Sequence, residues 1–125
     1  MLIKTKLTGE NSVIAIVNIL STSNNIIVNI SDIYNKTICI GSGGLLGIKG
    51  SKRSTSYAGQ AIGFTLGKKI FILGIRYLYI KIKGFGHGRY SCIKGLSLSG
   101  IKILSISDCT HIPFNGCKPS KRRRM

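Results

Sequence analysis

The chain has 125 residues, which is enough for one domain with a hydrophobic core and too few for two domains of ordinary size. Lys and Arg number 19, Asp and Glu number 3, and the formal net charge is +16, so nucleic acid is the expected partner. The only carboxylate side chains are Glu10, Asp32 and Asp108, too few for the converging acids of a metal-dependent nuclease or an acid–base pair, so we expect no enzyme and no small-molecule substrate.

The cations also argue against a membrane-spanning helix. The most apolar stretch, residues 61–75, contains Lys68 and Lys69 and is shorter than the roughly 18 apolar residues that a spanning helix needs. An anionic membrane surface is a weaker alternative partner for so many cations, and we expect no membrane partner.

Three strands are predicted in the first third of the chain. Residues 12–20 form a β-branched apolar run that is typical of a strand buried on one or both faces. Asn24 and Asn25 then make a turn, and residues 26–31 and 37–40 are further strands separated by a hairpin-length loop. These short connections predict an antiparallel three-stranded start.

A glycine-rich loop over residues 41–56 then leads into a helix. The loop has five glycines and three cations and is predicted to be flexible. Apolar residues next recur every three or four positions, which predicts a helix that stops at Gly74. Residues 69–73 suit a strand equally well, which would end the helix earlier. The expected N-cap is one of three hydroxyl residues, Ser54, Thr55 or Ser56.

The second half of the chain reads as strand, helix, strand. Residues 76–83 alternate regularly, with Leu and Ile on one face and Tyr and Lys on the other. A short helix over 90–98 and a strand over 102–107 follow, and this unit predicts a parallel pair of strands. The predicted fold is an α/β sandwich around a mixed five-stranded sheet, in the order β-β-β-α-β-α-β.

The loop over residues 84–89 is a candidate anion site, because it follows a strand and precedes a helix N-terminus. Its Gly-x-Gly-x-Gly pattern and Asp108, about twenty residues beyond, partly fit a dinucleotide fingerprint, but the third glycine is not at the required interval. We therefore expect a phosphate contact, with a plain structural turn as the alternative, and no nucleotide cofactor. Nearby aromatic and basic residues, which core packing explains as often as base stacking does, are Tyr77, Tyr79, Phe85, Tyr90, Lys81, Lys83 and Arg89.

Neither a metal site nor a catalytic residue is predicted. No pair of cysteines has the two-residue spacing of a zinc knuckle, and the intervals between Cys109, His111 and Cys117 fit no standard site. His87 has no carboxylate near it in sequence to orient it as a base, so a phosphate contact or an exposed imidazole is expected instead. The four cysteines, expected to be reduced structural thiols, are Cys39, Cys92, Cys109 and Cys117.

The last fifteen residues are predicted to be an extended basic tail. Pro113 and Pro119 each lack a backbone donor, and Asn115-Gly116 supplies a tight bend. The four consecutive cations over 121–124 repel one another unless a polyanion neutralises them. We divide the chain into one α/β RNA-binding domain over residues 1–110, of which 1–11 are a short N-terminal arm, and a basic C-terminal tail over residues 111–125.

Four ordered groups of residues carry a resemblance to a known family. They are Asn24-Asn25; Gly50 to Thr55 ahead of Ala58 and Gln60; Lys83-Gly84, Gly86 and Gly88-Arg89; and Asp108, Thr110, Ile112-Pro113, Asn115-Gly116-Cys117 and Pro119 before Lys121 to Arg124. With these motifs, the chain from about Ser12 to its end resembles the universal small-subunit ribosomal protein eleven family. The resemblance implies a ribonuclease H-like fold that lacks the nuclease carboxylates.

The same resemblance implies a structural role in the small ribosomal subunit, in support of translation. Members of the family lie on the platform against small-subunit ribosomal RNA, near the mRNA exit channel and the tRNA exit site, beside other platform proteins. The resemblance also implies that Asn115 forms isoaspartate. RNA-binding residues implied by the family are Lys49, Lys52, Arg53, Ser54 and Thr55 in the first loop, Gly84, Gly86, Gly88 and Arg89 in the second, and Asn115, Lys118, Lys121, Arg122, Arg123 and Arg124 in the tail. His87 is added to these candidates as the phosphate contact expected from the second loop itself.

Six positions depart from the family pattern and indicate a divergent organellar lineage. Together with heavy use of Ile, Lys, Asn and Ser and no visible import leader, they predict a mitochondrial ribosome, with a plastid ribosome as the alternative. A free-standing binder of single-stranded nucleic acid is the alternative function. The departures are Ser56, Phe85, His87 and Ser120 in place of prolines, Tyr90 in place of an acid, and Phe114 in place of a histidine.

Overall fold

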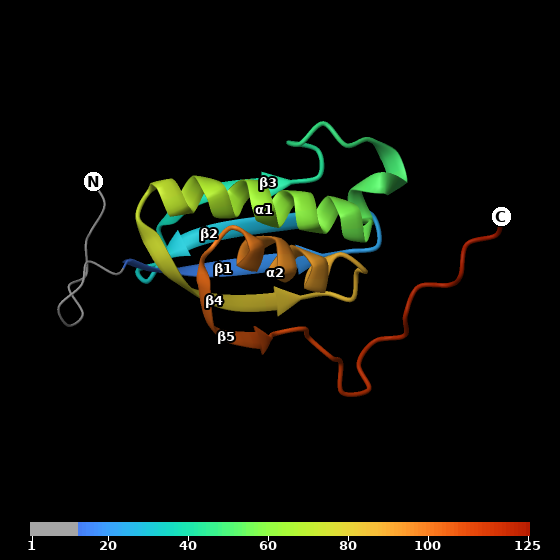
Figure 1. Cartoon of the computed structure of the whole chain (residues 1–125). Coiled ribbons are helices and arrows are strands. Elements are labelled where there is room, and N and C mark those ends of the chain that lie inside the picture. Colours follow the sequence, from blue (N-terminus) through green and yellow to red (C-terminus); the bar gives the residue numbers. More distant parts are fainter. Residues whose placement is uncertain (1–12) are drawn as a thin grey trace.

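The computed structural model describes residues 13–125 (Figure 1), so the predicted N-terminal arm over residues 1–11 lies outside the described residues. The elements are β1 (Val13–Ser21), β2 (Ile26–Asp32), β3 (Thr37–Ser42), a 3₁₀ helix η1 (Gly50–Ser54), α1 (Ser56–Ile72), β4 (Ile75–Lys83), α2 (Arg89–Leu98) and β5 (Lys102–Asp108).

The five strands form one mixed sheet in the order β3-β2-β1-β4-β5. β1, β2 and β3 pair antiparallel through short turns, whereas β4 lies parallel to β1 and β5 lies parallel to β4. The parallel pairs need long crossovers, which α1 and α2 provide. The predicted α/β class and the order β-β-β-α-β-α-β are therefore confirmed.

Both helices pack on the same face of the sheet and build the core there (Figure 1). Every second residue of the central strands faces the helices, as the alternation in the sequence predicted, and these side chains are fully buried. The sandwich therefore has two layers, and the other face of the sheet has no helix over it among the described residues. The buried strand residues include Ala15, Val17, Ile19, Val28, Ile30, Leu78, Ile80 and Ile82.

α1 and α2 approach each other closely because glycines line the contact. A Cβ on Gly63 would collide with the carbonyl oxygen of Cys92, and one on Gly95 would collide with the carbonyl oxygen of Gln60. The predicted stop at Gly74 is also confirmed, since α1 continues to Ile72 and Gly74 adopts φ +90°. Residues 69–72 stay helical because Ile70 completes the buried stripe of α1.

Candidate nucleic-acid interface

One edge of the sheet collects all three basic segments. β1, β3, β4 and β5 run in the same direction and end at this edge, and both crossover helices begin there (Figure 1). The two helix N-termini are neighbours, because the backbone around Gly88 lies against the Thr55 carbonyl and against Gly59 of α1. The carboxyl edge of an α/β sheet is where such folds ordinarily bind ligands.

The first loop, residues 43–55, is held together by hydrogen bonds within the loop. The Ile48 N–H donates to the Gly43 carbonyl at 3.1 Å, and η1 then leads into α1. The Arg53 side chain folds back, with Nε donating to the Ile48 carbonyl at 2.7 Å, and it packs against Gly43. The segment predicted as a flexible loop therefore contains a short helix and a bracing cation that the glycine content concealed.

Ser54 and Thr55 make their hydrogen bonds within the same loop. The Ser54 hydroxyl donates to the Ser51 carbonyl at 3.1 Å, and the Thr55 hydroxyl donates to the Lys52 carbonyl at 2.7 Å. Thr55 Oγ1 also accepts the Ala58 N–H at 3.3 Å, so Thr55 is the N-cap of α1, one of the three predicted caps. In contrast, Lys49 and Lys52 are exposed.

The second loop, residues 84–88, is packed tightly against the end of β1. The Gly84 N–H donates to Thr110 Oγ1 and the Gly86 N–H donates to the Ser21 carbonyl, both at 3.1 Å. Gly84 has φ +95°, and a Cβ there would collide with the Ser21 carbonyl. These two glycines therefore allow close packing, and their N–H groups are not directed at an external phosphate as the anion-site hypothesis requires.

The donors that remain for an anion in this loop belong to the start of α2. α2 begins after Gly88 without a side-chain cap, which leaves the N–H groups of its first turn to an outside acceptor. His87 is exposed between two buried glycines, Gly86 and Gly88. The candidate contacts of the second loop are thus the helix start and His87.

Arg89 is held by groups of the chain itself. Its Nη1 donates to the Gly84 carbonyl at 3.0 Å and lies 3.6 Å from Asp108 Oδ2, and its guanidinium carbon is 4.7 Å from the centroid of the Tyr90 ring. Asp108 Oδ1 accepts both the hydroxyl and the N–H of Thr110, at 2.6 Å and 3.0 Å. These two hydrogen bonds, with Arg89 nearby, hold the pKa of Asp108 below its usual value.

The contacts of Asp108 do not favour the dinucleotide-binding alternative. The acid expected to bind a ribose, Asp108, is instead occupied by Thr110 and Arg89. Asp32 ends β2, which runs opposite to β5, so the two carboxylates lie at opposite edges of the sheet and form no pair.

Within residues 13–125 there is no group of three or more His, Cys, Asp or Glu residues placed to hold a metal ion. Burial raises the pKa of the Cys92 thiol to about 12.

The tail leaves the sheet from β5 at the same edge and is exposed throughout residues 111–125 (Figure 1). Asn115 adopts φ +55°, the left-handed conformation that its bend requires. Lys118 and the four cations of residues 121–124 lie beyond this bend. No helix in the described part of the chain is long and apolar enough to cross a membrane.

Three residues at this edge hold the loops in place but were not among the predicted RNA-binding residues. Ser21, Asp108 and Thr110 fix the second loop and the root of the tail through the hydrogen bonds given above. Thr110 two positions after Asp108 is a spacing that suits a local side-chain turn. Nothing in the sequence around Ser21 indicates its contact, because that contact joins two segments far apart in the chain.

Known proteins are similar to this chain over most of its length. The family model described as ribosomal protein S11 matches residues 15–124. The small ribosomal subunit protein uS11 of Vesicomyosocius okutanii subsp. Calyptogena okutanii (strain HA) is 44% identical over 110 residues, which are 88% of this chain and 86% of that protein. The uS11 of Ruthia magnifica subsp. Calyptogena magnifica is 44% identical over 110 residues, 88% and 87% of the two chains. The uS11 of Endomicrobium trichonymphae is 43% identical over 122 residues, 98% and 91% of the two chains.

Proposed function

Because this chain belongs to the ribosomal protein S11 family, we propose that the edge described above is the surface through which it binds small-subunit ribosomal RNA. As a member of the family, it is a structural, non-enzymatic constituent of the small ribosomal subunit. We call this surface the basic edge; it comprises Lys49, Lys52, Arg53, His87, Arg89, Lys118 and residues 121–124.

The convergence of three separate segments supports this proposal. The two loops and the tail are far apart in sequence, yet the parallel strands bring them to one edge of the sheet. Asp108 is the only carboxylate side chain of the described residues at this edge, and it faces Arg89. Among residues 13–125, no other carboxylate side chain lies at this edge to neutralise the remaining cations, and unneutralised cations are what a phosphate backbone binds.

The contacts within the chain indicate which residues of the basic edge are free to touch RNA and which hold the loops. Lys49, Lys52 and the tail cations are exposed and are proposed to contact phosphates. Arg53 and Arg89 brace the loops, and Ser54, Thr55, Gly84, Gly86 and Gly88 shape them. We propose that these bracing residues act on RNA through the backbone and donors they position.

We further propose that the chain lies on the platform, near the mRNA exit channel and the tRNA exit site, beside other platform proteins. The support is the motif resemblance together with an exposed tail that leaves from the RNA-binding edge. Photo-crosslinking from residues 118–124 in translating ribosomes tests the position near mRNA. Crosslinks confined to segments of ribosomal RNA away from the exit channel would contradict it.

For the cellular location, we propose a mitochondrial ribosome, with a plastid ribosome as the second choice. The support is the compositional bias and the six departures from the family pattern. Fractionation of the source cells followed by quantification of this chain in organellar and cytosolic ribosomes decides it. Recovery in a ribosome outside both organelles would remove this proposal and leave the ribosomal role unaffected.

At Asn115 we propose isoaspartate formation. Asn115 and Gly116 are both exposed, and Gly116 has no side chain to hinder attack of its backbone nitrogen on the Asn115 side-chain carbonyl carbon. This attack releases ammonia and gives a succinimide, which water then opens. Peptide mass spectrometry of assembled particles tests this proposal, and a spectrum with only unmodified Asn115 would reject it.

Sedimentation tests the central proposal. In a sucrose gradient at moderate salt the chain is expected to travel with small subunits, and a variant with alanine at residues 121–124 is expected to be retained less. Lys36→Ala, which removes an exposed cation from the opposite edge, is the matched control. A wild-type chain that stays at the top of the gradient while binding single-stranded oligonucleotides would favour a free-standing binder.

A further inference from the structure

The open face of the sheet, which no helix of the described residues covers, is more apolar than a solvated sheet face ordinarily is. Across the paired strands Leu20 lies beside Ile27, and Ile16 lies beside Tyr79, with the polar row of Asn18, Asn29 and Lys81 between the two pairs. Exposed apolar side chains gathered on one face mark an interaction site. Its exposed members and their exposed fractions are Leu20 (38%), Ile27 (41%), Ile40 (54%) and Tyr79 (40%), with Ile14, Ile16 and Tyr77 half-buried among them.

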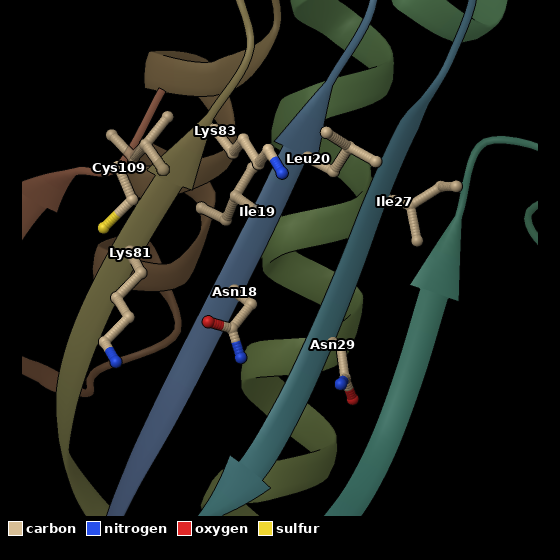
Figure 2. Close-up of a pocket in the computed structure, with 9 residues that line it drawn as sticks. Asn18, Ile19, Leu20, Ile27, Asn29, Lys81, Lys83 and Cys109 are labelled. Carbon is tan, nitrogen blue, oxygen red and sulfur yellow. The ribbon is translucent and has the colours of Figure 1, made fainter. Parts of the chain in front are cut away.

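A depression of about 260 Å³ lies in this face, next to the end of β1. Leu20 and Ile27 line one side of it and Lys81 and Lys83 line the other, as Figure 2 shows. Asn18 and Asn29, which lie opposite each other on β1 and β2, also line it. The Oδ1 atom of Asn29 is buried and has no hydrogen-bond partner among the described residues.

Among residues 13–125, the charged side chains that we place on the open face are positive. Lys81, Lys83 and Lys102 project from it, as the strand alternation and pairing require. The carboxylate side chains among residues 13–125 are on the other face, because Asp32 pairs with buried Ala15 and Asp108 pairs with buried Ile82. A partner that complements this face therefore brings apolar groups and carboxylates together.

We propose that the open face is a docking surface for an acidic, apolar segment of another small-subunit protein, an inference that rests on the proposed function. An apolar side chain of that segment fills the depression between Leu20 and Ile27, and its carboxylates meet Lys81 and Lys83.

Two other occupants fit the face less well. A second copy of this chain would bring the same lysines against Lys81, Lys83 and Lys102, with no carboxylate side chain of residues 13–125 on either open face to offset the repulsion. A single strand of RNA needs cations along its path and aromatic rings for its bases. Here the cations and the rings of Tyr77 and Tyr79 are confined to β4 and β5, and the β1–β3 half of the face presents Leu, Ile and Asn side chains and no cation.

Carbodiimide crosslinking of purified native small subunits tests the proposal directly, because this reagent joins amines to carboxylates in contact. We expect Lys81 or Lys83 to be joined to an Asp or Glu of one other subunit protein, identified by peptide mass spectrometry. We also expect both lysines to be acetylated more slowly in the subunit than in the isolated chain. Crosslinks of Tyr79 to ribosomal RNA under ultraviolet light, or unprotected lysines, would overturn the proposal.

A charge-insertion pair gives a second readout. Subunits assembled with Leu20→Lys or Ile27→Lys are expected to keep this chain but to retain the crosslinked partner about tenfold less, since a lysine replaces an apolar contact. Ile72→Lys is the matched control, because Ile72 is 84% exposed on α1. Equal retention of all proteins in both variants would reject the docking surface. If the wild-type chain itself is absent from small subunits, the proposed function fails instead.

Discussion

Arg89 Nη1 lies 3.6 Å from Asp108 Oδ2, which ties the first residue of α2 to the last residue of β5. Asp108 in turn accepts two hydrogen bonds from Thr110, and Thr110 accepts the Gly84 N–H. One carboxylate thereby links the second loop, α2 and the root of the tail. The consequence is that the tail begins in a defined direction although the residues beyond it are exposed.

Asp108→Asn is expected to loosen this linkage and to change the dependence of stability on pH. The folded-state pKa of Asp108 is lowered, so its contribution to stability is complete above the unfolded pKa and is lost as pH falls through the folded pKa. Thermal unfolding of the full chain between neutral and acidic pH measures this loss. The variant is expected to be less stable at neutral pH and to lose less stability on acidification; parallel curves for the two proteins would contradict the role of Asp108.

Gly84→Ala is expected to destabilise the fold more than Gly47→Ala. Both glycines have positive φ, so each alanine costs about 1 to 2 kcal/mol in backbone conformation. Only Gly84 lies against the Ser21 carbonyl, whereas nothing lies within 4 Å of a Cβ on Gly47. Urea unfolding of the two variants separates close approach from backbone strain, and equal losses would show that packing against Ser21 adds nothing.

Arg53→Ala is expected to lower both stability and RNA affinity, whereas Lys52→Ala is expected to lower RNA affinity alone. Arg53 donates to the Ile48 carbonyl, so its loss is expected to lower the free energy of unfolding by about 1 to 2 kcal/mol as well as RNA affinity. Lys52 is exposed, and its loss is expected to weaken RNA binding with stability unchanged. Denaturant unfolding and filter binding to a small-subunit RNA fragment measure the two effects; an Arg53→Ala protein of native stability would remove the bracing role.

Each tail cation is expected to contribute to the salt dependence of RNA binding. Removing Arg123 by alanine substitution should reduce the slope of log K against log salt by about 0.7 to 0.9, because one fewer phosphate is neutralised. Lys36→Ala is expected to leave the slope unchanged, since Lys36 lies in the hairpin turn at the opposite edge. Titrations at four salt concentrations suffice, and identical slopes for Arg123→Ala and wild type would exclude the tail from the interface.

The strands and helices were predictable because their signals are local. Alternation in residues 76–83 and the three- and four-residue spacing before Gly74 reflect which side chains a regular element turns toward one core. The first loop was predicted less well, since the interaction that braces it runs from the Arg53 side chain to a backbone carbonyl five residues earlier. The number of glycines indicates how many backbone conformations a segment can adopt, but it does not show the contacts that restrict the segment to one of them.

The candidate RNA-binding residues differ in how the folded chain places them. Lys52 is exposed, as a phosphate contact must be, whereas Arg89 is largely engaged by Asp108 and Gly84. The glycines of the second loop suggested an anion cradle, yet two of their N–H groups bond to Ser21 and Thr110. A glycine needed for close packing and one needed for phosphate approach are identical in a sequence.

By itself, the sequence determined the class of the fold, the shortage of carboxylates and the excess of positive charge, since side-chain chemistry and its periodicity require no knowledge of distant contacts. The tertiary structure alone decided that two loops and a tail share one edge, that Asp108 restrains Arg89, and that Leu20, Ile27 and Tyr79 gather on an uncovered face. These relationships depend on strand order and register, which bring together residues that the chain holds far apart.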